Sequence, residues 1–192
     1  MKIIAEEKIR RRGRLLAGLN QDPRVVQMID GMAQALQKGN KVLAFGNGGS
    51  ATQSSHFAAE LVNKFYFRRP ALPALALSAD VANLTAIAND EEFAAVFSRQ
   101  VEAFAAAGDV ALGITTSGRS ENVLRGLAKA REMGALTMAL AGSRTEELRA
   151  IPVDVLVAVE DADTPIIQEM HLFLLHVVAE AVEKKLFGGN HD

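Results

Sequence analysis

The segment KVLAFGNGGSA, residues 41–51, joins a short apolar run to a glycine-rich turn. A run as short and as continuously apolar as Lys41–Phe45 is typical of a strand that is buried on both faces of a sheet. The glycines let backbone N–H groups point into a concavity, and the helix expected from about Ser50 adds its positive N-terminal end. The segment therefore predicts a strand–turn–helix unit whose turn is either a candidate anion site or simply a tight turn.

The same pattern recurs along the rest of the chain. Four more short apolar runs are each followed by a polar turn and a helical segment: Ala74–Ser78, Asp109–Ile114, Ala135–Ala141 and Val153–Val159. Strands that alternate with helices form right-handed βαβ units, which build a parallel sheet covered on both faces. We therefore expect an α/β fold with a five-stranded parallel sheet flanked by helices.

Helical patterns precede and follow these strands. An N-terminal helical hairpin is expected over residues 1–39, where apolar residues recur at helical spacing on either side of Asp22 and Pro23. Thr164–Phe187 predicts one long C-terminal helix, so that residues 40–192 hold the α/β core and this helix. A chain of 192 residues is expected to form a single domain.

Composition excludes several classes of protein. The absence of cysteine excludes thiol catalysis, disulfides and cysteine zinc sites. A net charge of −2, with neither half strongly basic, argues against nucleic acid as a partner. No uninterrupted apolar run approaches the roughly 20 residues that span a bilayer, and the N-terminus lacks the apolar core of a signal peptide. We therefore expect a cytoplasmic protein with no membrane partner.

A second turn, TTSGRS at residues 115–120, follows the third predicted strand. Its hydroxyl groups stand where the next helix begins, a place that suits an anion. One serine would be enough to cap that helix, so the simpler alternative is that Ser117 or Ser120 is only a cap. In such sheets the ligand binds at the carboxyl ends of the strands. Two polar turns at that edge favour a phosphorylated sugar or polyol over a nucleotide.

Ionisable residues stand on two of the predicted helices. His56 and Glu60, four residues apart, share a helix face and could bind a metal or transfer protons, or form only a surface pair. The last helix offers Gln168, His171 and His176 on an otherwise apolar face, where a single histidine is usually a core residue. Because Gln168 and His176 lie about 12 Å apart along a helix axis, one metal bound by both requires an irregular helix or two subunits.

Together these motifs resemble the SIS (sugar isomerase) domain family. The resemblance rests on GNGGS with His56 and Glu60, on TTSGRS, and on ADTPIIQE at residues 162–169 leading to His176, and it covers essentially the whole chain. It implies a flavodoxin-like three-layer sandwich and an aldose–ketose isomerase. The implied reaction converts sedoheptulose 7-phosphate to D-glycero-D-manno-heptose 7-phosphate, for bacterial heptose and lipopolysaccharide precursors. It also implies one zinc ion per subunit and a homotetramer with active sites between subunits.

The resemblance also implies a role for each matching residue. The implied metal ligands are His56, Glu60, Gln168 and His176. The implied substrate contacts are Asn47, Gly48, Gly49, Ser50, Glu60, Asn89, Asp90 and Gln168, with the phosphate on Thr115, Thr116, Ser117 and Ser120. Moving a carbonyl between neighbouring carbons through an enediol needs a base and an acid. Glu60 is the candidate base and His176 its partner in proton transfer.

Two alternatives without catalysis remain. The stretch at residues 83–90 and the Leu186–Phe187 tail also resemble the bacterial protein that associates with the replication initiator DnaA. The other alternative is a module that senses a sugar phosphate without turnover. The presence of both Glu60 and His176 favours the enzyme, because a buried ionisable pair is costly to keep without use.

Overall fold

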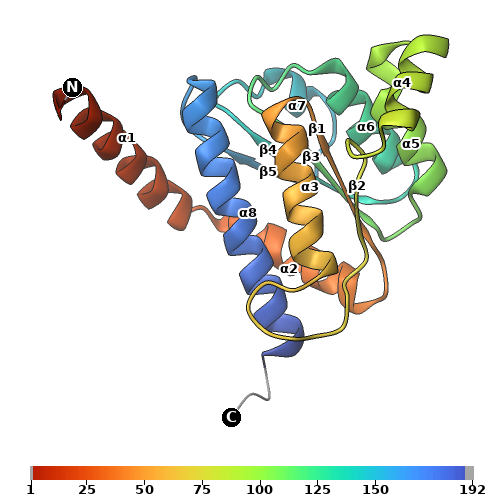
Figure 1. Cartoon of the computed structure of the whole chain (residues 1–192), viewed down its shortest axis with the longest axis horizontal. Helices are drawn as coiled ribbons and strands as arrows, with labels where there is room; N and C mark the ends of the chain where they lie inside the picture. The colour runs from red at the N-terminus through yellow and green to blue at the C-terminus, as the bar shows by residue number, and fades with distance from the viewer. Residues whose placement is uncertain (1, 189–192) are drawn as a thin grey trace.

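A parallel sheet forms the middle layer of the computed structural model, which describes residues 2–188 (Figure 1). The strands of this sheet are hydrogen-bonded to one another in the order β2-β1-β3-β4-β5. The strands are β1 (Val42–Gly46), β2 (Ala74–Ala76), β3 (Val110–Thr115), β4 (Leu136–Ala141) and β5 (Val155–Ala158). Each lies within or overlaps one of the predicted apolar runs, which confirms the α/β prediction. The ends of the predicted single domain, residue 1 and residues 189–192, lie outside the described residues.

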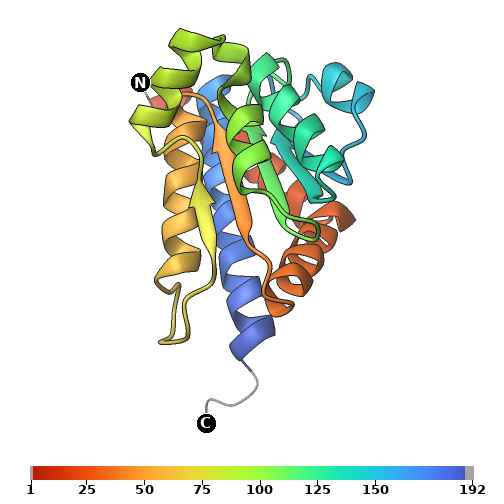
Figure 2. The same cartoon turned by 90° about the vertical axis from the view of Figure 1, so that its right-hand side faces the viewer.

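Both faces of the sheet are covered, and this explains why its strands are so apolar. Successive side chains of β1 point to opposite faces, so Val42 and Ala44 join one core while Leu43 and Phe45 join the other. The first face is covered by α2 (Pro23–Gln37), α3 (Gly49–Val62) and α8 (Thr164–Phe187). The second is covered by η1 (Phe93–Ala95), α5 (Val96–Phe104), α6 (Glu121–Glu132) and α7 (Glu146–Ala150), with α4 (Val81–Asp90) at its margin (Figure 2).

The strand order places a topological switch point beside β1. From β1 the chain moves outward to β2 on one side, and then to β3, β4 and β5 on the other. Ligands of open α/β sheets bind at the carboxyl ends of the strands that flank such a point. The turns after β1 and β3, which are the two turns selected from the sequence, therefore lie side by side at this position.

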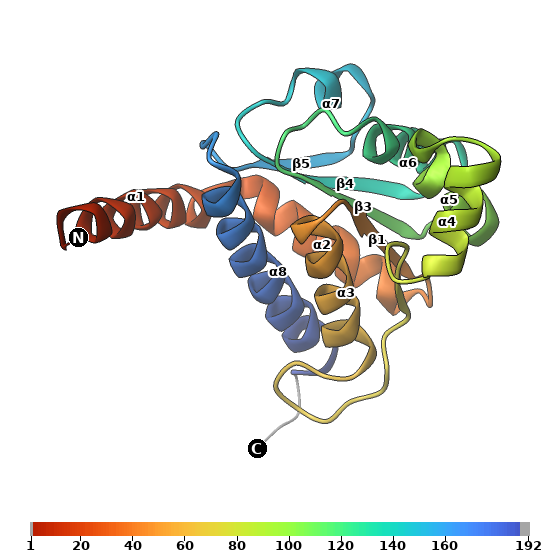
Figure 3. The same cartoon turned by 45° about the horizontal axis from the view of Figure 1, so that its top comes forward.

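The N-terminal helices differ in one respect from the prediction. Both α1 (Lys2–Asn20) and α2 are present, and Asp22 caps α2 by accepting from the N–H of Arg24 at 2.9 Å. However, α1 does not fold back along α2 as a hairpin but projects away from the sheet (Figure 3). Its contacts are instead with the start of α8, where Arg11 pairs with Asp161 and Arg12 pairs with Glu169. These two ion pairs link α1 to the start of α8, while Leu19 near its C-terminal end is buried in the core.

Helix α8 is the one helix in residues 2–188 that is long and apolar enough to cross a membrane. The search for uninterrupted apolar runs in the sequence did not find this helix, because polar residues interrupt its apolar stretches. Half of its most apolar window is buried inside the protein, and the helix packs against α2 and α3. These contacts identify α8 as a core helix.

The carboxylate of Asp109 ties together the amino ends of β1 and β3. It is buried, and it accepts hydrogen bonds from the Lys41 N–H at 2.9 Å, from Lys41 Nζ at 2.6 Å and from the Ala106 N–H at 2.7 Å. Burial alone would raise the pKa of Asp109, but the bonds from Lys41 and Ala106 outweigh it and hold the pKa below its usual value.

Replacing this carboxylate should cost stability in a pH-dependent way. We expect Asp109→Asn to lower the free energy of unfolding at pH 7 by about 2 kcal/mol, because buried donors lose an ionised acceptor. A depressed pKa stabilises the fold above the unfolded value of about 3.9, and this contribution is lost as the pH falls through the folded value. Urea denaturation at pH 7 and pH 3 should therefore show a smaller deficit at pH 3; equal deficits would contradict this account.

Candidate functional site

The turns after β1 and β3 are joined by a pair of side-chain amides. Asn47 Nδ2 donates to Asn122 Oδ1 at 2.8 Å, and Asn122 Nδ2 donates to Asn47 Oδ1 at 2.9 Å. Asn122 lies in the first turn of α6 and is buried. Sequence reasoning missed Asn122 because its partner is 75 positions away and no local pattern marks it. The pair fixes the spacing between the two predicted turns.

The glycine-rich turn lies directly against the first turns of α8. A Cβ at Gly49 would stand 2.4 Å from Nε2 of Gln168, so a larger residue there would displace the Gln168 amide from this position. Gln53 Nε2 donates to the main-chain carbonyl of Gln168 at 2.6 Å, while its own Oε1 is buried and has no hydrogen-bond partner among residues 2–188. Ser50 is buried where α3 begins. Gln168 therefore belongs with the predicted sugar-binding turn.

The hydroxyl groups of the second turn face one another at the start of α6. Thr115 Oγ1 lies 3.1 Å from Ser120 Oγ and 3.4 Å from Ser117 Oγ. Ser120 occupies the N-cap position, but its side chain makes no capping hydrogen bond. Thr116 lies between these residues and is half-buried. The capping alternative therefore does not account for Ser120, and the hydroxyl cluster is open to an anion at a helix N-terminus.

Glycine at position 118 is required by the packing of this turn. Gly118 has a φ of +69°, and a Cβ there would stand 1.9 Å from the carbonyl oxygen of Arg144. Its N–H donates to Thr115 Oγ1 at 3.2 Å. The turn after β3 is thus pressed against the segment that follows β4, which holds the hydroxyl cluster in one conformation.

A second group of candidate residues lies on the facing sides of α3 and α8. His56 Nε2 is 2.8 Å from His176 Nε2 and 3.4 Å from Glu60 Oε1. One ligand atom from each of the three residues lies within 4.8 Å of the others. The short contact between imidazole nitrogens requires one ring to donate a proton to the other. Two imidazoles and a carboxylate, with the His56 side chain 43% exposed, fit a metal site that has three protein ligands and one open position.

This group is separated from the two turns. His56 lies about 10 Å along α3 from Gly49 by helical rise. Helix α8 is regular from Thr164 to Phe187, so the alternative of an irregular helix near Gln168 is wrong. Within one protomer, Gln168 therefore lies with the glycine-rich turn, and the metal-ligand types that come together are His56, Glu60 and His176.

Asn89 and Asp90 lie at the exposed end of α4. Asn89 Nδ2 donates to Asp90 Oδ1 at 2.8 Å, and neither side chain hydrogen-bonds to another candidate residue within positions 2–188. One protomer therefore does not join these two residues to the rest of the predicted site.

His171 is a core residue, as expected for a single histidine on an apolar helix. It is fully buried, and its Nε2–H donates to the carbonyl of Ala141 at 3.1 Å. Burial lowers the pKa of His171 to about 4, so that its imidazole is neutral at pH 7.

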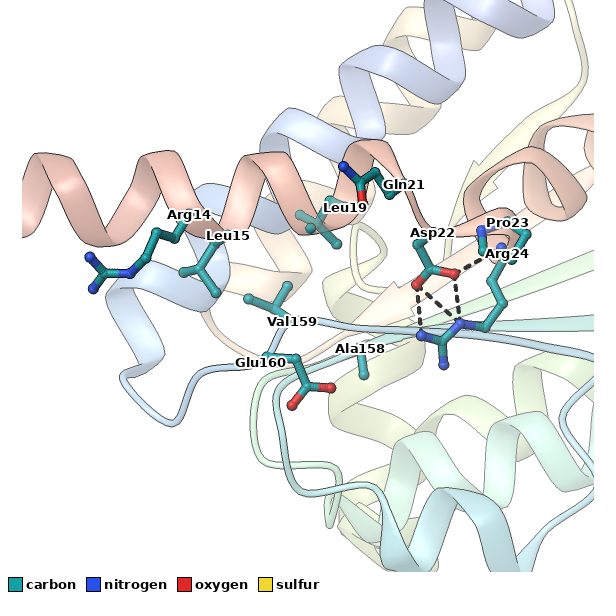
Figure 4. A pocket seen from close by; sticks show the side chains of 11 residues that line it. Arg14, Leu15, Leu19, Gln21, Asp22, Pro23, Arg24, Ala158, Val159 and Glu160 are labelled. Carbon is teal, nitrogen blue, oxygen red and sulfur yellow. Dashed lines mark hydrogen bonds and ion pairs between the residues drawn. The ribbon is translucent and has the colours of Figure 1, made fainter.

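A cavity of about 300 Å³ lies elsewhere, between the end of α1, the start of α2 and the carboxyl end of β5 (Figure 4). None of the predicted site residues lines it. Its carboxylate at Asp22 already caps α2 and pairs with Arg24 Nη2 at 2.7 Å.

Sequence and fold are both similar to those of known proteins. The SIS domain family matches residues 12–142. The chain is 50% identical over 165 residues to the phosphoheptose isomerase of Pelobacter propionicus, covering 86% of this chain and 87% of that protein. It is 49% identical over 164 residues to the phosphoheptose isomerase of Geobacter sulfurreducens, covering 85% and 86%.

Two solved structures have nearly the same fold. The phosphoheptose isomerase of Neisseria gonorrhoeae matches with a TM-score of 0.87 at 36% identity, covering 95% of this chain and 98% of that chain. The phosphoheptose isomerase of Francisella tularensis matches with a TM-score of 0.88 at 31% identity, covering 94% and 96%.

Ser120 can be separated experimentally from true capping residues. We expect Ser120→Ala to change the free energy of unfolding by less than about 0.5 kcal/mol, whereas Asp22→Ala should cost at least about 1 kcal/mol, because Asp22 accepts from an N–H group of its helix and Ser120 does not. Urea denaturation of the two variants measures the difference. Equal losses would show that Ser120 serves as a cap.

Proposed function

The chain belongs to the phosphoheptose isomerases of the SIS domain family, and from this premise we propose that it interconverts sedoheptulose 7-phosphate and D-glycero-D-manno-heptose 7-phosphate. The observation that carries the proposal is the meeting of Glu60 and His176, whose ligand atoms lie within 4.8 Å although the residues stand on different helices. The product would serve bacterial heptose and lipopolysaccharide precursors. A regulator or a sensing module would not need this pair.

The reaction moves a carbonyl between C2 and C1 through an enediol. Glu60 removes a proton from the carbon beside the carbonyl, and a proton is returned from Glu60 or His176 to the neighbouring carbon, while His176 exchanges protons with the substrate oxygens. When no metal is bound, the contact between His56 Nε2 and His176 Nε2 at 2.8 Å fixes which ring nitrogen of His176 carries the proton. The base, Glu60, therefore comes from α3, and its partner in proton transfer, His176, comes from α8.

The turns at the switch point hold the rest of the substrate. The phosphate binds to the hydroxyls of Thr115, Thr116, Ser117 and Ser120 and to the N-terminus of α6. The sugar hydroxyls bind Asn47 to Ser50 and Gln168, with Asn89 and Asp90 supplied by the assembled enzyme. The reacting groups lie about 10 Å along α3 from the glycine-rich turn, which lies beside the phosphate turn. This spacing suits a substrate that carries its phosphate at the far end of a seven-carbon chain.

Zinc is the metal that best fits His56, Glu60 and His176. When bound, it would polarise the substrate carbonyl as a Lewis acid. Glu60 would act as the base only when it is released from the metal, so its two roles would alternate during turnover. Since α8 is regular, a fourth ligand from Gln168 would have to come from a second copy of the chain.

We propose a homotetramer that works in the cytoplasm. Helix α4 is apolar but has no buried residue in one protomer, and Val81 at its start is 69% exposed. Helix α1 likewise projects from the protomer (Figure 3). Both helices are available for contacts between copies, which would place the active sites between subunits. The cytoplasmic location rests on a phosphorylated sugar as substrate.

The proposed reaction can be followed directly. We expect the purified chain to convert sedoheptulose 7-phosphate to D-glycero-D-manno-heptose 7-phosphate, and added zinc to restore the rate after treatment with a chelator. One-dimensional NMR of the sugar protons measures product with and without zinc. Absence of product under both conditions would overturn the proposed function.

Glu60 should be essential for turnover. We expect Glu60→Gln to lower kcat by about 100-fold or more, because an amide cannot act as a general base. The matched control is Glu132→Gln, whose side chain is 65% exposed on α6 and pairs with Lys129. Steady-state kinetics of the two variants, with folding checked by circular dichroism, measure the effect. Full activity of Glu60→Gln would refute the assignment.

A further inference from the structure

A fully buried ion pair lies between the end of α3 and the C-terminal half of α8. Arg69 Nε donates to Glu183 Oε1 at 3.0 Å, and the two side chains are only 2% and 1% exposed. Neither residue belongs to a motif that marked the site. Burying two charges costs free energy unless each group makes several further hydrogen bonds. The other contacts of Arg69 and Glu183 are therefore the ones that offset this cost.

Arg69 also holds the end of the helix that carries Glu60. Its Nη2 donates to the carbonyl of Glu60 at 2.8 Å, and its Nη1 donates to the carbonyl of Leu61 at 2.8 Å. The last carbonyls of a helix have no partner within the helix and carry partial negative charge, so a cation there is favourable. The main chain of the proposed base is therefore fixed by the guanidinium of Arg69.

Glu183 fixes the segment that packs on His176. Its carboxylate accepts hydrogen bonds from the N–H groups of Phe65 at 2.8 Å and Tyr66 at 2.6 Å. The ring of Phe65 then lies 5.8 Å from the ring of His176, which contacts His56 at a centroid distance of 5.0 Å. In Figure 1 the segment after α3 swings past the lower part of α8.

From these contacts we infer that Arg69 and Glu183 are positioning residues for the proposed reacting pair. Arg69 holds Glu60 through its main chain, and Glu183 holds His176 through Phe65. Because Arg69 and Glu183 pair with each other, a substitution of either residue should move Glu60 and His176 relative to each other. The inference rests on the proposed function for its kinetic consequences, but the geometric effect on His176 does not depend on activity.

A role in stability alone is the alternative, and the chain offers a matched control for it. Asp109 is a buried carboxylate that also pairs with a cation and accepts from backbone N–H groups, but it lies at the amino ends of β1 and β3. Asp109→Asn should lower stability without reaching Glu60 or His176. It therefore measures the effect of losing a comparable carboxylate away from the site.

The test compares Arg69→Gln, Glu183→Gln and Asp109→Asn in two assays. The first is steady-state kinetics with sedoheptulose 7-phosphate. We expect kcat of Arg69→Gln and Glu183→Gln to fall by about 100-fold, as displacements of about 1 Å can cause, with KM changed by less than about threefold because the phosphate turn is untouched. Asp109→Asn should keep both constants.

The second assay is NMR of the histidine ring resonances in the metal-free chain without substrate. We expect the His176 signals to shift in Arg69→Gln and Glu183→Gln, because the ring of Phe65 moves relative to His176, and to stay in place in Asp109→Asn. Phe65→Leu supplies a milder variant, since it removes the ring but keeps the ion pair; it should shift the His176 signals and lower kcat.

Folded Arg69→Gln and Glu183→Gln proteins with unchanged kcat and unchanged His176 signals would overturn the inference. If these variants do not fold, Phe65→Leu decides: unchanged kcat and signals in that variant would overturn it equally. A wild-type chain that does not convert the substrate would refute the proposed function instead. In that case the His176 signals still test the positioning role.

Discussion

The side-by-side packing of α3 and α8 is the contact on which the site depends. Phe57 and Leu61 of α3 share one core with Leu174 and Leu175 of α8, and burying such side chains is the main source of stability at this interface. The Gln53 bond to the Gln168 carbonyl fixes how far one helix is displaced along the other. In this register the Nε2 atoms of His56 and His176, which are 120 positions apart in the chain, lie 2.8 Å from each other.

Buried carboxylates hold the elements around this interface. Asp109 joins the strands at the amino ends, Asp161 links α1 to the segment before α8, and Glu183 links α8 to the segment after α3. Each accepts from a backbone N–H as well as from a basic side chain. This pattern reflects the cost of an ionised group away from water, which is bearable only when its lone pairs are satisfied. The protein thus uses charge to fix loops that its apolar core does not reach.

Local patterns were sufficient for the strands, both turns and the pairing of His56 with Glu60. Short apolar runs and glycine positions are properties of neighbouring residues, and four-residue spacing determines a helix face. The amide pair of Asn47 and Asn122 and the ion pair of Arg69 and Glu183 join residues 75 and 114 positions apart. Such pairs leave no periodic signal. The direction of α1 was missed for the same reason, because its partners lie beside and within α8.

The amino-acid sequence by itself determined the parallel sheet and the two polar turns at its edge, because buried strands and tight turns depend on near neighbours in the chain. It also supplied the types of residue needed for proton transfer and metal binding. Only the tertiary structure decided that His176 joins His56 and Glu60 while Gln168 joins Gly49. The physical reason is that the relative placement of two helices is set by side-chain packing across the whole interface, which no local segment contains.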